Sequence, residues 1–203
     1  MKKNKINIIN NKMNKLNYKI DNTNDNKPKL LSIDEMSIIT NRTPTKGWAL
    51  KNKECIINLP DVKPNKRYSL LIASSNNKIV KYLLVEKSIK TDTFIKFLNE
   101  LHNENKNYTY LIDNASIHRN KTTFMFYKEK KLNVVYNAPY QSKFNPIEMV
   151  FSLLRKKLNK EIVKDEDSIN NVIKMFIENI KKETLENIFN HSIKILKVYL
   201  KKT

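Results

Sequence analysis

The chain has 203 residues, 40% of them hydrophobic, which is enough for one ordinary globular domain with extensions. Its 39 Lys and Arg residues against 20 Asp and Glu give a formal charge of +19, which favours a phosphate-bearing partner, although AT-rich codons also produce many Lys, Asn and Ile residues. The single cysteine, Cys55, excludes an intrachain disulfide and a cysteine-based zinc site, and the lack of a ~20-residue apolar run or a secretory signal argues against a membrane or secreted protein. We therefore expect an intracellular protein without a membrane partner, in the cytoplasm of a prokaryote or in the nucleus or viral factory of another source.

Residues 1–29 differ in composition from the rest of the chain. They contain 17 Asn or Lys residues and carry a charge of +6. Such a segment cannot bury enough apolar surface to offset its ordering entropy, so we expect a disordered basic arm. The arm is either a tail that contacts DNA or a leader without a role.

Apolar runs after residue 29 predict the first strands. Residues 30–39 form a buried strand that contains Asp34, and residues 54–59 form a possible short strand closed by Pro60. Two further runs, residues 68–74 and 78–85, are separated by Ser75-Asn76-Asn77, which is typical of a hairpin.

Helices and strands alternate in the second half of the chain. Thr91 can cap a helix with apolar residues at helical spacing, and a short strand at residues 108–112 ends at Asp113. The remaining elements are a helix at 121–131, a strand at 132–136, a helix that starts at Pro146 and has Glu148 in its first turn, and two helical stripes beyond residue 165. This order predicts an α/β fold, a mixed sheet with helices on its faces and a helical C-terminal extension.

Three carboxylates lie at positions where such a fold could bring them together. Asp34 and Asp113 each follow an apolar run, and if their strands are neighbours both side chains emerge at one edge of the sheet, where Glu148 can join them. Two divalent ions held by carboxylates can cleave phosphodiesters. Each residue also has a simpler interpretation, because Asp often forms turns or caps helices and Glu favours a first helical turn. Glu35 is a weaker candidate that points to the opposite face if its strand continues.

Three segments carry a resemblance to a known family. Ser32-Ile33-Asp34-Glu35, Ile112 to His118 with Asp-Asn-Ala-x-x-His, and Pro139 to Glu148 with Asn-Pro-Ile-Glu are similar to the catalytic core of mariner-type DDE transposases. The 34 residues between Asp113 and Glu148 match the spacing of the insertion-sequence and mariner branch. The similarity runs from about Leu30 to Leu158 and includes Gly47-Trp48 and the run Tyr68 to Ala73.

The resemblance implies a ribonuclease H-like, mixed five-stranded catalytic domain over residues 30–160, followed by a helical extension at 161–203. It also implies cutting and joining of double-stranded DNA with two Mg²⁺ ions, for which Mn²⁺ can substitute. Carried over by position, Asp34 would bind both metals, Asp113 one of them and Glu148 the other.

Three more residues near the carboxylates are candidates for supporting roles. His118 either contacts DNA near the scissile phosphate, donates a hydrogen bond to a carboxylate, or merely caps the following helix. Asn114 and Asn145 could orient carboxylates or hold their loops.

Five basic residues are candidates for DNA contacts. Lys143 stands where the resembled family often has an acidic or neutral residue, in the loop before Glu148. The other four follow on the polar side of the helix and would either contact DNA phosphates or form an ordinary solvated face: Arg155, Lys156, Lys157 and Lys160.

The segment before Asp34 lacks the helix-turn-helix modules with which transposases of this type read their DNA ends. We expect either a separate helix-turn-helix subunit or a truncated or repurposed copy. The family implies a homodimer, because two ends are cut together. The alternative functions are a DNA-binding or regulatory remnant and a structure-selective nuclease.

Overall fold

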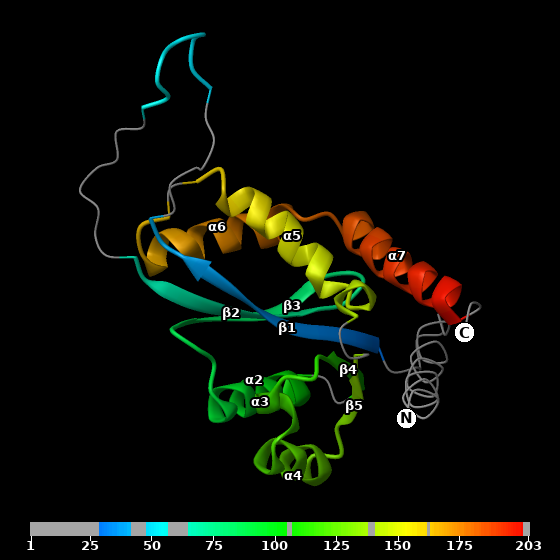
Figure 1. Ribbon diagram of the computed structural model, residues 1–203. Helices are drawn as coiled ribbons and strands as arrows, with labels where there is room; N and C mark the ends of the chain where they lie inside the picture. The colour runs from blue at the N-terminus through cyan, green and yellow to red at the C-terminus, as the bar shows by residue number, and fades with distance from the viewer. Residues whose placement is uncertain are drawn as a thin grey trace, which may run out of the picture.

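The computed structural model describes residues 29–41, 48–56, 65–104, 107–137, 141–161 and 163–200. A five-stranded sheet with the order β3-β2-β1-β4-β5 forms its centre (Figure 1). β2 pairs antiparallel with β1 and with β3, which completes a hairpin. On the other side of β1, β4 pairs parallel with β1, and β5 pairs parallel with β4. The strands are β1 (Lys29–Ile39), β2 (Arg67–Ser74), β3 (Ile79–Glu86), β4 (Tyr108–Ile112) and β5 (Asn133–Tyr136).

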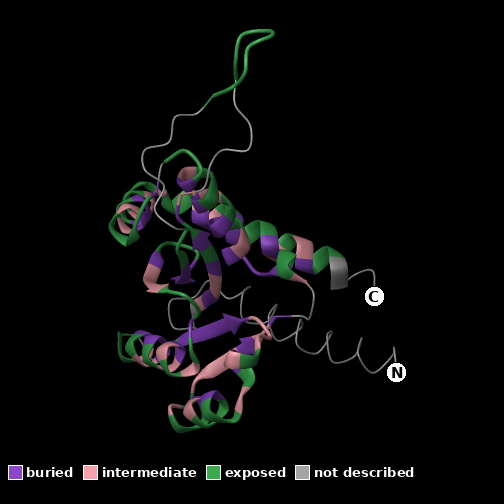
Figure 2. Ribbon diagram, turned by 60° about the vertical axis from the view of Figure 1, so that its left-hand side comes forward, coloured by how far each residue is buried: buried purple, intermediate pink, exposed green. Residues whose placement is uncertain are grey.

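Helices cover both faces of this sheet. One face carries α2, α3 and α4, and the other carries α5, α6 and α7 (Figure 1). Figure 2 shows buried residues along the sheet and on the helix sides turned toward it. The helices are α2 (Thr91–Glu104), α3 (Ser116–Arg119), α4 (Lys121–Glu129), the 3₁₀ turn η1 (Ser142–Phe144), α5 (Ile147–Leu158), α6 (Glu166–Asn179) and α7 (Lys182–Leu200).

The two faces of β1 belong to two separate hydrophobic clusters, as strand alternation requires. Leu31 and Ile33 pack with α2, whereas Met36 and Ile38 pack with α5. The second of these clusters also contains buried residues of α6 and α7. The C-terminal helices thus share the core of the sheet, and the predicted boundary at residue 160 stays a prediction.

Some expectations are corrected or fall outside the described residues. The possible strand at 54–59 is wrong over Glu54–Ile56, where the chain is exposed and irregular because it has no neighbouring strand there, and residues 57–59 lie outside the described residues. Also outside are residues 1–28 of the expected arm, the loop up to Gly47, and Ala138–Tyr140. Among the described helices, none is long and apolar enough to cross a membrane.

Candidate active site

Strand register places Asp34 and Asp113 beside each other. β1 pairs in parallel with β4 up to the partners Ile33 and Ile112, so Asp34 and Asp113 come next on adjacent strands. β4 ends there, whereas β1 continues because β2 still pairs with it opposite Asp34. Asp34 thus lies inside the strand predicted over residues 30–39, past the point where the pairing with β4 ends, and the expected juxtaposition of the two aspartates is found.

Glu148 reaches the same region from the start of α5. The helix begins at Ile147, one residue after the predicted start at Pro146, which is its N-cap, and Glu148 lies in the first turn as predicted. Its backbone N–H donates to the carbonyl oxygen of Asn145 at 3.2 Å. The charges of Glu148 and Asp113 both act on the Asp34 carboxyl. The three predicted carboxylates therefore form one electrostatic group.

Asp34 is held in a form that resists ionisation. Burial, followed by the charges of Asp113, Glu148 and Glu35, raises the pKa of Asp34 to about 7, against the hydrogen bond that it accepts from the Glu35 backbone N–H at 2.8 Å. Its Oδ2 accepts a hydrogen bond from Asn145 Nδ2 at 3.0 Å. An extra positive charge at this position would favour the carboxylate form.

Asp113 behaves in the opposite way. Burial acts to raise the pKa of Asp113, but the hydrogen bonds from His118 and from the Ala115 backbone, with the charge of His118, outweigh it and lower the pKa. The Oδ1 atom lies 2.5 Å from His118 Nδ1 and accepts the Ala115 N–H at 3.0 Å. Asp113 is thus ionised more readily than a free aspartate.

His118 is a buried support and not a surface contact. Its side chain is fully buried, and its ring lies 4.3 Å from the ring of Phe94. The hydroxyl groups of Tyr127 and Tyr136 both donate to its carbonyl oxygen, at 3.1 and 3.0 Å. This geometry supports the hydrogen bond to Asp113 and argues against the alternative of direct DNA contact.

The two predicted asparagines have different surroundings. Asn145 is almost fully buried and lies between the hydroxyl of Ser32, which donates to its Oδ1, and Asp34. Asn114 instead donates to the carbonyl oxygen of Asn137 at 2.6 Å, which ties the loop after β4 to the end of β5. The sequence analysis assigned no role to Ser32, although Ser32 belongs to a segment that carries the resemblance and lies two residues before Asp34 on the same face of β1.

The donor chemistry of this site suits a divalent cation. Carboxylate oxygens are the ligands that Mg²⁺ and Mn²⁺ prefer, and a group of like charges in a partly buried site favours a cation between them. Across the described residues, no three His, Cys, Asp or Glu side chains come close enough to hold a single ion together. The fit to a divalent cation therefore rests on the chemistry of the donors, with the charges of Asp113 and Glu148 both acting on Asp34.

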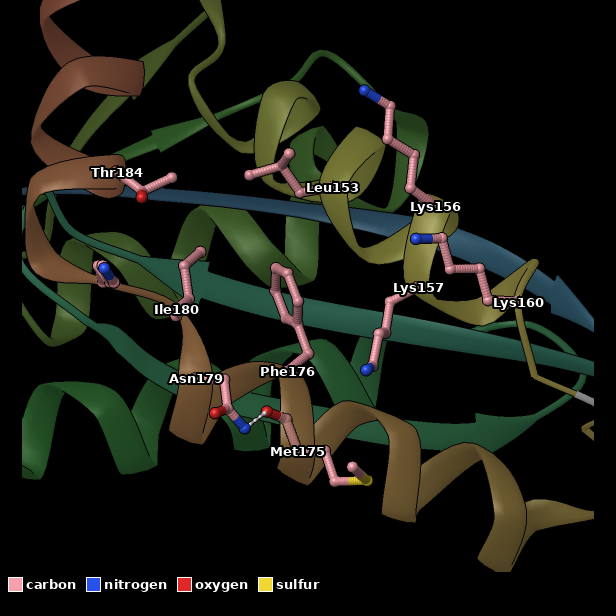
Figure 3. Close-up of a pocket in the computed structure, with 10 residues that line it drawn as sticks. Leu153, Lys156, Lys157, Lys160, Met175, Phe176, Asn179, Ile180 and Thr184 are labelled. Carbon is pink, nitrogen blue, oxygen red and sulfur yellow. Dashed lines mark hydrogen bonds between the residues drawn. The ribbon is translucent and has the colours of Figure 1, made fainter.

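The predicted basic residues do not form one surface. Lys156, Lys157 and Lys160 line an open groove of about 440 Å³ between α5, α6 and the start of α7, together with Lys181 (Figure 3). Its apolar lining consists of Leu153, Met175, Phe176 and Ile180. Lys160 follows the end of α5, Arg155 is exposed outside the groove, and Lys143 lies on η1 with its ammonium group 5.3 Å from the Phe144 ring centre.

The mixed sheet, with carboxylates from β1, the end of β4 and the start of α5, has the arrangement that the resemblance to a ribonuclease H-like catalytic domain implied. The model of the family described as DDE superfamily endonuclease matches residues 29–170. The chain belongs to this family. A search of curated proteins finds no match.

Solved structures of the Mos1 mariner transposase share this fold. A pre-cleavage Mos1 transpososome is 12% identical to this chain in sequence and has a TM-score of 0.76. The match covers 95% of this chain and 60% of the Mos1 chain. A Mos1 paired-end complex with Mg is 13% identical with a TM-score of 0.77 and the same coverage. The Mos1 catalytic domain is 13% identical and has a TM-score of 0.71. This match covers 93% of this chain and 88% of the Mos1 domain. The chain thus spans about 60% of the longer relatives, and both the ribonuclease H-like fold and the mariner-type resemblance are confirmed.

Proposed function

We propose that this chain is the catalytic part of a DNA transposase, which hydrolyses phosphodiesters at element ends and joins the ends to target DNA. The observation that supports this most directly is the electrostatic group of Asp34, Asp113 and Glu148, which come from three separate elements of a DDE-family fold. The neighbouring Mos1 structures include a strand transfer complex and complexes with Mg and with Mn.

The proposed roles follow from the positions of the carboxylates. Asp34 would contribute to both Mg²⁺ sites, with Asp113 completing one and Glu148 the other. When bound, two such ions supply charge stabilisation at phosphorus and activation of the attacking oxygen. Asn145 and His118 orient Asp34 and Asp113 through hydrogen bonds, and Asn114 holds the loop that carries Asp113.

Double-stranded DNA is the proposed substrate, and the groove lysines would bind its backbone. Lys156, Lys157 and Lys160 have no ion pair with any described acidic residue, so their charges remain available to phosphates. α5 carries Glu148 at its start and Lys156 and Lys157 about two turns later, and Lys160 follows its end, so DNA bound along this helix would reach the carboxylates. We include exposed Arg155 and Lys143 as additional contacts.

We further propose that the active form is a homodimer, because cutting two ends together requires two sites. A separate helix-turn-helix subunit would supply recognition of the end sequence if this polypeptide has no such module of its own. Mixing the purified chain with end-containing DNA and measuring the mass of the complex tests both points.

The deciding experiment is nicking of supercoiled plasmid by the purified chain with Mg²⁺ or Mn²⁺, with Asp113→Asn beside it. We expect metal-dependent nicking by the wild type and none by the variant. Bound but uncut plasmid would contradict the enzymatic proposal and favour a DNA-binding remnant. Cutting confined to branched DNA would instead favour a structure-selective nuclease.

A further inference from the structure

Ser32 is a buried polar residue next to the site. It lies on β1 two residues before Asp34, so strand alternation directs both side chains to the α5 face. The Ser32 side chain is fully buried, and its hydroxyl donates to Oδ1 of Asn145, which is 113 positions away in the sequence.

The Asn145 amide uses its two ends for different partners. Its carbonyl oxygen accepts the Ser32 proton, and its NH₂ group donates to Asp34 Oδ2 at 3.0 Å. A flipped amide would place its oxygen against Asp34, and with Asp34 ionised neither of the two facing oxygens could donate. Because Asn145 is only 1% exposed, solvent water has little access to replace a missing partner.

We propose that Ser32 is a positioning residue that orients Asp34 through Asn145. Its hydroxyl fixes which end of the amide faces the carboxylate, and the amide in turn fixes the direction of the Asp34 oxygens. This inference rests on the proposed function, because the orientation of Asp34 matters only if that carboxylate binds the metal ions.

The chain offers a matched control in Ser74. Ser74 is the direct partner of Ser32 in the register of β1 and β2 and is equally buried. Its hydroxyl donates to the Ser75 carbonyl oxygen at 3.1 Å instead of to Asn145. Ser74→Ala therefore removes a buried hydroxyl from the same part of the sheet without changing the contacts of the amide.

The first test reads the contact without metal or DNA. In ¹⁵N-labelled protein, the side-chain NH₂ signals of Asn145, identified by their absence in Asn145→Ala, should shift in Ser32→Ala and stay in place in Ser74→Ala. Unchanged signals in Ser32→Ala would overturn the proposal. This result does not depend on activity, so a wild type that fails to nick plasmid would reject the proposed function and leave the contact itself testable.

The second test measures Mn²⁺ affinity by calorimetry and nicking rate together. Both should fall about tenfold in Ser32→Ala, since partners of ligating side chains typically change affinity or activity by at least that factor. The double variant Ser32→Ala with Asn145→Ala should have the same Mn²⁺ affinity and nicking rate as Asn145→Ala alone, because Ser32 acts only through the amide. Additive losses would overturn the proposal.

A second pair of variants covers the case in which Ser32→Ala does not fold. Ser32→Thr keeps a hydroxyl, and Ser32→Val has the shape of threonine without one. Thermal unfolding should be similar for the two, while Mn²⁺ affinity should be about tenfold higher in the threonine variant. Equal affinities would contradict an orienting role for the hydroxyl.

Discussion

On one side of the site Asp34 lies inside β1 and receives an amide hydrogen bond from Asn145, whereas on the other side Asp113 follows the end of β4 and is paired with His118. Burial and neighbouring carboxylates raise the pKa of Asp34 to about 7, while the pKa of Asp113 lies below its usual value. The pKa shifts of the two aspartates thus have opposite signs, because burial and neighbouring carboxylates dominate at Asp34, whereas hydrogen bonds from His118 and the Ala115 backbone outweigh burial at Asp113.

This difference assigns different needs to the two carboxylates. Asp113 is already stabilised as an anion by protein groups, so it can offer a charged ligand at neutral pH. At Asp34, a bound cation would offset the burial and the acidic neighbours that raise its pKa. Under the proposed function, Asp113 would be ionised before a metal binds, whereas metal binding would complete the ionisation of Asp34.

The largest expected effect comes from removing any one of the three carboxylate charges. Asp34→Asn, Asp113→Asn and Glu148→Gln should each lower plasmid nicking by about a thousandfold or more, because metal ions contribute several kcal/mol to such reactions. DNA binding, measured by gel shift, should remain largely intact. Glu35→Gln is the matched control: the next residue along β1 faces the other side of the sheet and should be nearly silent. An inactive Glu35→Gln would mean that Glu35, beside Asp34, is the residue that the chemistry requires.

The two aspartates should affect metal-free stability with opposite signs. The raised pKa of Asp34 means that the folded state holds the Asp34 proton more tightly than the unfolded state does. The resulting contribution of Asp34 to the free energy of unfolding is fully present below pH ~4 and is lost as pH rises toward 7. Asp34→Asn should therefore stabilise the metal-free chain above pH 7, by ~4 kcal/mol at most, and have little effect near pH 4.

For Asp113 the lowered pKa gives the reverse. Its contribution is present above the unfolded value of 3.8 and is lost as pH falls through the lower folded value. Asp113→Asn should destabilise the protein at neutral pH and converge with the wild type in acid. Thermal unfolding between pH 3 and 8 checks both signs. If Asp34→Asn and Asp113→Asn both raised or both lowered the unfolding temperature at neutral pH, the proposed difference between the two aspartates would be wrong.

Smaller effects should follow from removing the supports. Asn145→Ala and His118→Ala should each reduce nicking by about 10- to 100-fold, as expected for groups that orient ligands. His118→Asn, which keeps a side-chain donor, should recover part of the activity. A His118→Ala variant with wild-type nicking would show that Asp113 needs no orientation.

The smallest effect per residue concerns the groove. Replacing Lys156, Lys157 and Lys160 by Gln should weaken DNA binding at all sequences and flatten the slope of log affinity against log salt by about 0.9 for each phosphate that is no longer neutralised. The same charge change at Lys96, Lys121 and Lys128, on the other face of the sheet, is the control. Equal slopes for the two triple variants would indicate only a general effect of net charge.

The sequence predicted the elements around the site well because their patterns are local. The apolar runs at residues 68–74 and 108–112 and the stripe after Pro146 each became the expected strand or helix. Residues 30–39 likewise became a strand that contains Asp34, and its pairing with β2 continues past the residue where the pairing with β4 ends.

Contacts between distant segments were the part that local patterns could not supply. Ser32 meets Asn145 only after β1 and η1 pack together, and Tyr127 and Tyr136 share one carbonyl oxygen from two different elements. The groove likewise combines lysines of α5 with side chains of α6 and α7. No spacing within a single helix or strand reports such meetings.

Asn145 also connects β1 to the start of α5. Its side-chain NH₂ group donates a hydrogen bond to Asp34, while its backbone carbonyl oxygen accepts one from the backbone N–H of Glu148. We therefore expect Asn145 to keep the spacing of the Asp34 and Glu148 carboxylates fixed. A single residue inserted between Asn145 and Glu148 would instead turn the glutamate by about 100° around α5 and away from the site.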